Sequence, residues 1–87
     1  MEIEFDTAKD LENRAKHGVP LAIGLHVLDA KMGDVEDTRH DYGETRMQAF
    51  GMVEGRLFVC VYTLRGDVYR LISVRKASRQ EQRSWLP

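Results

Sequence analysis

Cationic side chains interrupt the most apolar part of the chain, the segment RLFVCVYTLRGDVYRLISVRK at residues 56–76. The cations that follow its first residue, Arg56, are Arg65, Arg70, Arg75 and Lys76. Guanidinium groups held on a rigid backbone beside Tyr62 and Tyr69 suit the binding of phosphates and the stacking of bases. The alternative is that they are solvated strand residues whose aliphatic stems cover apolar surface. The residues alone leave both interpretations open.

Two antiparallel β-strands joined by a tight turn must carry these cations. Residues 57–64 and 68–74 are rich in apolar and β-favouring side chains. Apolar residues at both odd and even positions predict that the first strand is covered on both faces, as in the centre of a sheet. Gly66, in the break between the two runs, supplies the positive φ that a hairpin turn requires.

The register of this hairpin determines which face each arginine shares with the first strand. If Gly66-Asp67 alone forms the turn, Thr63 pairs with Arg70 and Phe58 with Arg75. A turn of three residues shifts the pairing by one position and exchanges the faces. Both registers remain open at this point.

A short strand over residues 1–5 and a helix over residues 7–17 are predicted at the start of the chain. Asp6 is a suitable N-cap for this helix, and Gly18 is a suitable residue to follow its last turn. The helical spacing predicts a core-facing side formed by Ala8, Leu11 and Ala15. An adjacent polar side carries Lys9, Asn13 and Lys16. We interpret it as a solvated side, with the alternative that Lys16 and His17 contact a phosphate.

A second helix and a polar section follow. Pro20 suits the first turn of a helix over about residues 20–29, whose inward stripe is Leu21, Leu25 and Leu28. In the polar section, residues 30–45, Val35 makes a short edge strand conceivable but poorly supported. Asp37, His40 and Asp41 match no metal-ligand spacing and are interpreted as an ordinary charged loop.

A further strand and a terminal helix complete the predicted elements. Residues 46–53 form a strand that a tight turn at Glu54-Gly55 joins to the hairpin, so that Arg46 lies across the sheet from the Thr63–Arg65 end. Residues 77–86 form a short helix. Its capping box consists of Ser78 and Glu81. Arg79 and Arg83 share one side of this helix, and Trp85 and Leu86 can pack on the sheet.

Composition restricts the class of protein. With 87 residues, 43% hydrophobic and 31% charged, the chain is expected to form a single globular domain over residues 1–87. The longest apolar run is too short for a membrane span, the N-terminus is not signal-like, and Cys60 has no partner for a disulfide, so we expect a cytoplasmic protein. Residues 1–45 have a net charge of −6 and residues 46–87 of +5. This asymmetry favours nucleic acid or an acidic partner for the second half.

The order of elements predicts an α+β domain: an antiparallel sheet of about four strands, with two N-terminal helices and one C-terminal helix on one face.

Three segments together resemble the BrnT toxins of bacterial type II toxin–antitoxin systems. They are FDTAKDLENRAKHGV at 5–19, DTRHDYGETR at 37–46 and GRLFVCVYTLRGDVYRLISVRKASRQE at 55–81. The resemblance runs in order over nearly the whole chain. Its departures include Phe5, where the family often has Trp, and none of them affects the arginines. It implies a RelE-like fold and a ribonuclease toxin that arrests translation and growth. It also implies a BrnA-type ribbon–helix–helix antitoxin as partner in a hetero-oligomer that binds operator DNA through the antitoxin.

For a metal-independent endoribonuclease without cofactor, the 2′-hydroxyl of RNA is the nucleophile. We expect Arg65 and Arg75 to bind the scissile phosphate and Lys76 to protonate the leaving 5′-oxygen. Candidate bases are His17, His40 and Glu44. Further substrate contacts are expected from Lys9, Lys16, Arg46, Arg70 and Arg79. The alternative function is a non-catalytic binding module whose basic sheet holds an antitoxin or nucleic acid, because no clear acid–base pair is present.

Overall fold

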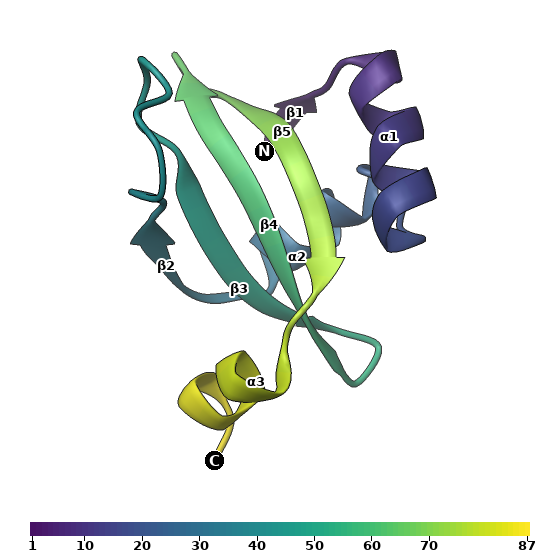
Figure 1. The fold of residues 1–87 in the computed structure, drawn as a ribbon, viewed down its shortest axis with the longest axis vertical. Coiled ribbons are helices and arrows are strands. Elements are labelled where there is room, and N and C mark those ends of the chain that lie inside the picture. Colours follow the sequence, from purple (N-terminus) through teal and green to yellow (C-terminus); the bar gives the residue numbers. More distant parts are fainter.

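A five-stranded mixed sheet forms the centre of the molecule in a computed structural model that describes residues 1–87. The strands are β1 (Glu2–Glu4), β2 (Lys31–Glu36), β3 (Met47–Val53), β4 (Arg56–Arg65) and β5 (Val68–Lys76). The helices are α1 (Thr7–His17), α2 (Ile23–Asp29) and α3 (Arg79–Trp85). The strand order is β1-β5-β4-β3-β2, with β1 parallel to β5 and all other neighbours antiparallel (Figure 1). The predicted α+β class is confirmed, with five strands in place of about four.

The strand with the weakest support in the sequence, β2, forms one edge of the sheet. It pairs with β3 from Lys31–Gly51 to Glu36–Met47. All of its side chains are exposed or half-buried, so the strand depends on backbone hydrogen bonds to β3 and lacks a clear apolar pattern. None of the three helices is long and apolar enough to cross a membrane.

The helices lie on different sides of the sheet, which corrects the expectation that they share one face. In Figure 1, α2 lies behind the sheet, and α3 lies below its lower end. The contact of α2 is so close that a Cβ at Gly51 would collide with the carbonyl oxygen of Val27. On the other face Trp85, from α3, stacks on Phe50 with 4.6 Å between ring centroids. The two faces have separate apolar clusters because both faces of β4 are apolar.

Helix α1 lies beside β5 and buries polar side chains, so the prediction of an Ala8, Leu11 and Ala15 core side is wrong. Leu11 is 62% exposed, whereas Asp10 and Asn13 are buried. The Asn13 amide donates to the Val74 carbonyl at 2.8 Å, and the Val74 N–H donates to the Asn13 carbonyl oxygen at 3.1 Å. The backbone of β5 needs these partners where β1 ends, and this need outweighs the burial of one leucine.

The predicted helix caps and hairpin turns are confirmed. The Asp6 side chain accepts hydrogen bonds from the Ala8 and Lys9 N–H groups, and Gly18 takes the left-handed conformation after α1. The capping box of α3 is complete. The Glu54-Gly55 turn and the Gly66-Asp67 turn are two-residue hairpin connections.

Of the two residue pairs predicted for a two-residue turn in the β4–β5 hairpin, one is correct and one is wrong. Thr63 pairs with Arg70, as a two-residue turn requires. Phe58 pairs with Lys76 and not with Arg75, because the pairing shifts by one residue between Tyr62 and Val61. The shift leaves Ile72 as an extra residue in β5, which is a β-bulge.

Candidate functional site

The bulge at Ile72 decides which face the β5 arginines occupy. On a regular strand, residues five positions apart point to opposite faces of the sheet. With the extra residue, Arg70 is opposite Thr63 and Arg75 is opposite Val59. Thr63 and Val59 lie on the same face as Arg65, so Arg65, Arg70 and Arg75 share one face, which we name the arginine face.

Four cations converge on one hollow of about 200 Å³ on this face, which we name the arginine hollow. Its charged lining residues are Lys9, Arg46, Arg65, Arg70, Asp6 and Glu44. The cations come from α1, from the residue before β3, from β4 and from β5. Four positive groups against two carboxylates leave a positive balance, and guanidinium groups match the oxygens of a phosphate.

Carboxylates hold the guanidinium groups of the hollow loosely. Glu44 lies between two of them, 3.3 Å from Nε of Arg46 and 3.8 Å from Nη2 of Arg65. Arg70 lies 3.7 Å from Glu4. Arg65 remains 57% exposed. The pairs of Arg65 and Arg70, at 3.8 and 3.7 Å, contribute little stability, so these two guanidinium groups are available to another anion.

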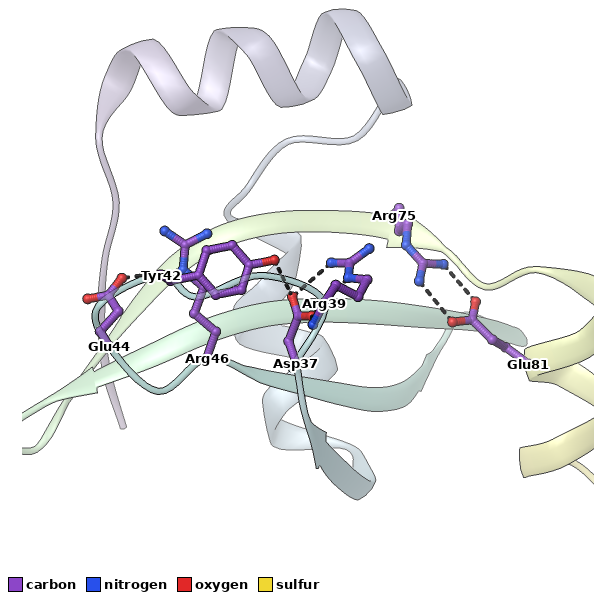
Figure 2. Close-up of polar contacts among 7 residues, drawn as sticks. All are labelled: Asp37, Arg39, Tyr42, Glu44, Arg46, Arg75 and Glu81. Carbon is purple, nitrogen blue, oxygen red and sulfur yellow. Dashed lines mark hydrogen bonds and ion pairs between the residues drawn. The ribbon is translucent and has the colours of Figure 1, made fainter.

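The loop between β2 and β3 is folded over this side of the molecule by a buried carboxylate, Asp37 (Figure 2). Nε and Nη2 of Arg39 each donate to Asp37 at 2.8 Å, and the Tyr42 hydroxyl donates to it at 3.2 Å. The Arg39 side-chain hydrogen bonds hold the pKa of the Asp37 carboxyl well below its usual range. The Arg46 guanidinium lies over the Tyr42 ring, 4.0 Å from its centroid. No group of three His, Cys, Asp or Glu side chains in the chain could hold a metal ion.

A second hollow of about 180 Å³ adjoins the first and shares Lys9 and Ile72 with it. Its other polar lining residues are Glu12, Asn13, Lys16, His17 and Ser73, and we name it the α1 hollow. Partial burial, followed by the charges of Lys16 and Arg75, lowers the pKa of His17 below its usual value. His17 is therefore a neutral imidazole near pH 7, with an acceptor nitrogen among cations.

The family model described as the ribonuclease toxin BrnT of type II toxin–antitoxin systems matches residues 5–81. The chain belongs to the BrnT family. A search of curated proteins found no match to the chain. The matched range contains every side chain that lines either hollow.

Arg75, expected to share a phosphate with Arg65, lies elsewhere on the arginine face of this BrnT-family fold. Its partner Val59 is six residues from Arg65 along β4, or roughly 20 Å at the rise of a strand. Two arginine side chains cannot bind one phosphate across that distance. Nη1 and Nη2 of Arg75 instead donate to the two carboxylate oxygens of Glu81 at 2.7 and 2.8 Å, apart from the Tyr42 group (Figure 2). The expectation of a shared phosphate is wrong.

Lys76 and Arg79 lie away from both hollows. Lys76 pairs with Phe58 on the opposite face of the sheet, in a depression that includes Pro20 and Arg56. Arg79 lies on α3, in a shallow depression with Arg83. Neither residue is placed to act on a substrate bound between the arginines of the sheet.

Aromatic side chains near the arginines differ from the sequence-based expectation. Tyr62 is 3% exposed on the face opposite the arginines, where its hydroxyl donates to Asp34 at 2.8 Å. Tyr69 packs against Tyr62, with 5.0 Å between ring centroids. Tyr62 is buried and Tyr69 is partly buried, and both lie on the face opposite the arginines, so neither can stack a base beside them. Tyr42 was not predicted to be a functional residue, and its only signal in the sequence is an aromatic side chain shortly before Arg46 in a polar loop.

Proposed function

We propose that this BrnT-family protein is a toxin that cleaves RNA and that RNA phosphates bind in the arginine hollow. The observation that carries the proposal is the convergence of Lys9, Arg46, Arg65 and Arg70 from four separate segments of the chain on one hollow. Cations fixed on a sheet can stabilise the extra negative charge that a phosphate gains in the transition state.

In the proposed reaction the 2′-oxygen of RNA forms a bond to phosphorus while the bond from phosphorus to the 5′-oxygen breaks. The proton of the 2′-hydroxyl passes to a base, and the leaving 5′-oxygen takes up a proton. The products are a 2′,3′-cyclic phosphate and a 5′-hydroxyl. The protein has to supply position, proton transfer and positive charge.

We assign the base to His17. It lines the α1 hollow, next to the arginine hollow, and its lowered pKa keeps it neutral and able to accept a proton at pH 7. Lys9 lines both hollows and there offers positive charge and a proton to the leaving oxygen. Glu44 contacts Arg46 and Arg65, so we assign it the holding of these two groups in place of proton transfer. His40 is exposed and lines neither hollow.

We propose that the reaction needs no metal ion or other cofactor, because RNA brings its own nucleophile and the arginines supply the positive charge. The expected outcome is cleavage that persists in EDTA and leaves 2′,3′-cyclic or 3′-phosphate ends. Products with 3′-hydroxyl ends, or activity that chelation abolishes and Mg²⁺ restores, would contradict this mechanism.

The partner we propose is a BrnA-type ribbon–helix–helix antitoxin, in a hetero-oligomer that binds operator DNA through the antitoxin. Unbound toxin would act in the cytoplasm, where its RNA substrate is translated. The antitoxin would neutralise the toxin by covering the arginine face.

One observation favours a second candidate, the non-catalytic binding module. Arg46, Arg65 and Arg70 are each paired with a carboxylate of the chain itself, as they would be with an acidic segment of a bound antitoxin. Such a module would bind RNA or antitoxin without breaking a bond.

Purified, antitoxin-free protein incubated with single-stranded RNA separates the two functions. We expect cleavage by the wild type and by Arg56→Ala, which removes an exposed cation outside both hollows. Arg65→Ala and Arg70→Ala should each lower the cleavage rate by roughly 100- to 1,000-fold, the usual effect of losing a transition-state charge contact. Binding without cleavage by the wild type would establish the module, and equal rates in all four proteins would remove the arginine hollow from the mechanism.

A further inference from the structure

We propose that Tyr42 is a positioning residue that holds the Arg46 guanidinium ready for phosphate binding in the arginine hollow. The proposal rests on the proposed RNA-binding function of that hollow. It assigns a role to a side chain that does not line the hollow itself.

The contact between the two residues is direct. The guanidinium carbon of Arg46 lies 4.0 Å from the centroid of the Tyr42 ring, and Nε of Arg46 donates to Glu44 at 3.3 Å. The Arg46 side chain is only 23% exposed, whereas Arg65 in the same hollow is 57% exposed. A long side chain that is already held loses less conformational freedom when a phosphate arrives.

Asp37 holds Tyr42 in place through a hydrogen bond. The tyrosine hydroxyl donates to Asp37 at 3.2 Å, and the Asp37 side chain is 1% exposed. The Asp37 N–H also donates to the Arg46 carbonyl at 2.7 Å. Asp37 therefore fixes both the backbone of Arg46 and the ring on which its side chain lies, as Figure 2 shows for the side chains.

The same contacts argue against Tyr42 as a platform for RNA bases. The Arg46 guanidinium covers one face of the ring, the hydroxyl is bonded to Asp37, and His40 meets the ring edge-on at 5.7 Å between centroids. A platform for a base needs an open ring face beside the phosphate track. The position of the ring under Arg46 is what favours an indirect role.

A double-mutant cycle on RNA affinity tests the role. The probe is a single-stranded 2′-O-methyl oligonucleotide, which cannot be cleaved through its own 2′-hydroxyl. Arg46→Ala should weaken binding roughly tenfold, as expected for one charge-assisted phosphate contact. Tyr42→Ala should weaken binding about two- to fivefold, the range of an exposed cation–π contact. In the Arg46→Ala background, Tyr42→Ala should have no further effect, and Tyr42→Phe, which keeps the ring, should lose less than Tyr42→Ala.

If Tyr42→Ala merely disorders the loop, it should weaken RNA binding equally in the wild-type and Arg46→Ala backgrounds. That result would overturn the proposal. So would direct stacking of a base, because the effect of Tyr42→Ala would then survive the loss of Arg46. Thermal unfolding of each variant identifies any that fail to fold, and Tyr42→Phe keeps the test valid if Tyr42→Ala is among them. The failure of the proposed function looks different: the wild type itself would not bind the oligonucleotide, or Arg46→Ala would bind as well as the wild type.

Discussion

Arg75 and Glu81 share two hydrogen bonds, of 2.7 and 2.8 Å, that tie α3 to β5. Glu81 also accepts the Ser78 N–H at 2.8 Å as part of the helix cap. One carboxylate thus completes the first turn of α3 and anchors it to the sheet. Trp85 on Phe50 anchors the other end of this seven-residue helix, which buries no residue completely.

Arg75→Ala and Glu81→Gln should each loosen α3 without unfolding the sheet. A partly exposed bidentate ion pair contributes on the order of 1 kcal/mol, so the whole domain should remain folded. The fluorescence of Trp85, the only tryptophan of the chain, reports on the docking of α3. Arg83→Ala, on the same helix but outside the pair, should leave the signal unchanged. If Arg75→Ala abolishes RNA cleavage while Trp85 fluorescence and Glu81→Gln activity stay normal, Arg75 acts on RNA directly.

Acid should loosen the same contact. The hydrogen bonds from Arg75 lower the pKa of Glu81 to about 2 in the folded protein. Because the folded-state pKa lies below the unfolded value near 4.3, the contribution of this carboxylate is complete above that value and is lost as the pH falls toward 2. Trp85 fluorescence should change over this interval in the wild type. The change should be absent in Glu81→Gln, and an identical transition in both proteins would assign it to other carboxylates.

Cleavage should depend on pH through His17. Burial and the neighbouring cations lower the pKa of this imidazole, so the base becomes protonated only below the range of an ordinary histidine. The rate should be flat at neutral pH and fall with acid below about pH 6.5. His17→Ala should lower the rate by roughly 100- to 10,000-fold and remove this acid limb. An acid limb that persists in the variant would transfer the base role to another group.

The bulge at Ile72 offers a test of how the hairpin aligns its arginines. Deletion of Ile72 removes the extra residue and leaves Arg70 and Arg75 four positions apart on a regular strand, where they still share one face. RNA binding and the docking of α3 should then both be retained, because both arginines keep their face. Ile72→Ala, which keeps the number of residues, should retain both. Circular dichroism checks that the sheet persists, and loss of RNA binding or of the normal Trp85 fluorescence in a folded deletion variant would contradict the assigned register.

Added salt should slow the association of the antitoxin more than it speeds its dissociation. The reason is that charges at the rim of an interface act mainly on the rate of encounter. The measurement compares the wild type with Arg65→Gln/Arg75→Gln over a range of ionic strength. We expect slower association of the double variant and a flatter dependence on salt. An association rate that neither salt nor the variant changes would place the antitoxin on another surface.

The site was only partly predictable, for reasons that particular residues make clear. Arg46, Arg65, Arg70 and Lys9 were each singled out by residue type and predicted element, and the structure brings them into one hollow. The expected sharing of a phosphate by Arg75 and Arg65 failed because Arg75 lies opposite Val59, six residues from Arg65 along β4. Lys76 lies on the opposite face of the sheet because of the bulge at Ile72, which no residue between Val68 and Lys76 indicates. A single unpaired residue reverses the face of every side chain beyond it.

Local chemistry is what the sequence by itself determined. Asp6, Gly18, Ser78 with Glu81, and Gly66 each act within a few residues of their own position, so their caps and turns follow from the order of residues alone. The order of short motifs also indicated the BrnT family, which the match over residues 5–81 confirms.

Only the tertiary structure decided where polar groups find their partners. Asn13 is buried and Leu11 is exposed because the backbone of β5 needs hydrogen bonds at Val74. Glu81 is bound to Arg75 because α3 returns to the sheet on the face that the bulge gave to that arginine. Such partners are distant along the chain or fixed by a register shift, and neither spacing nor composition encodes that geometry.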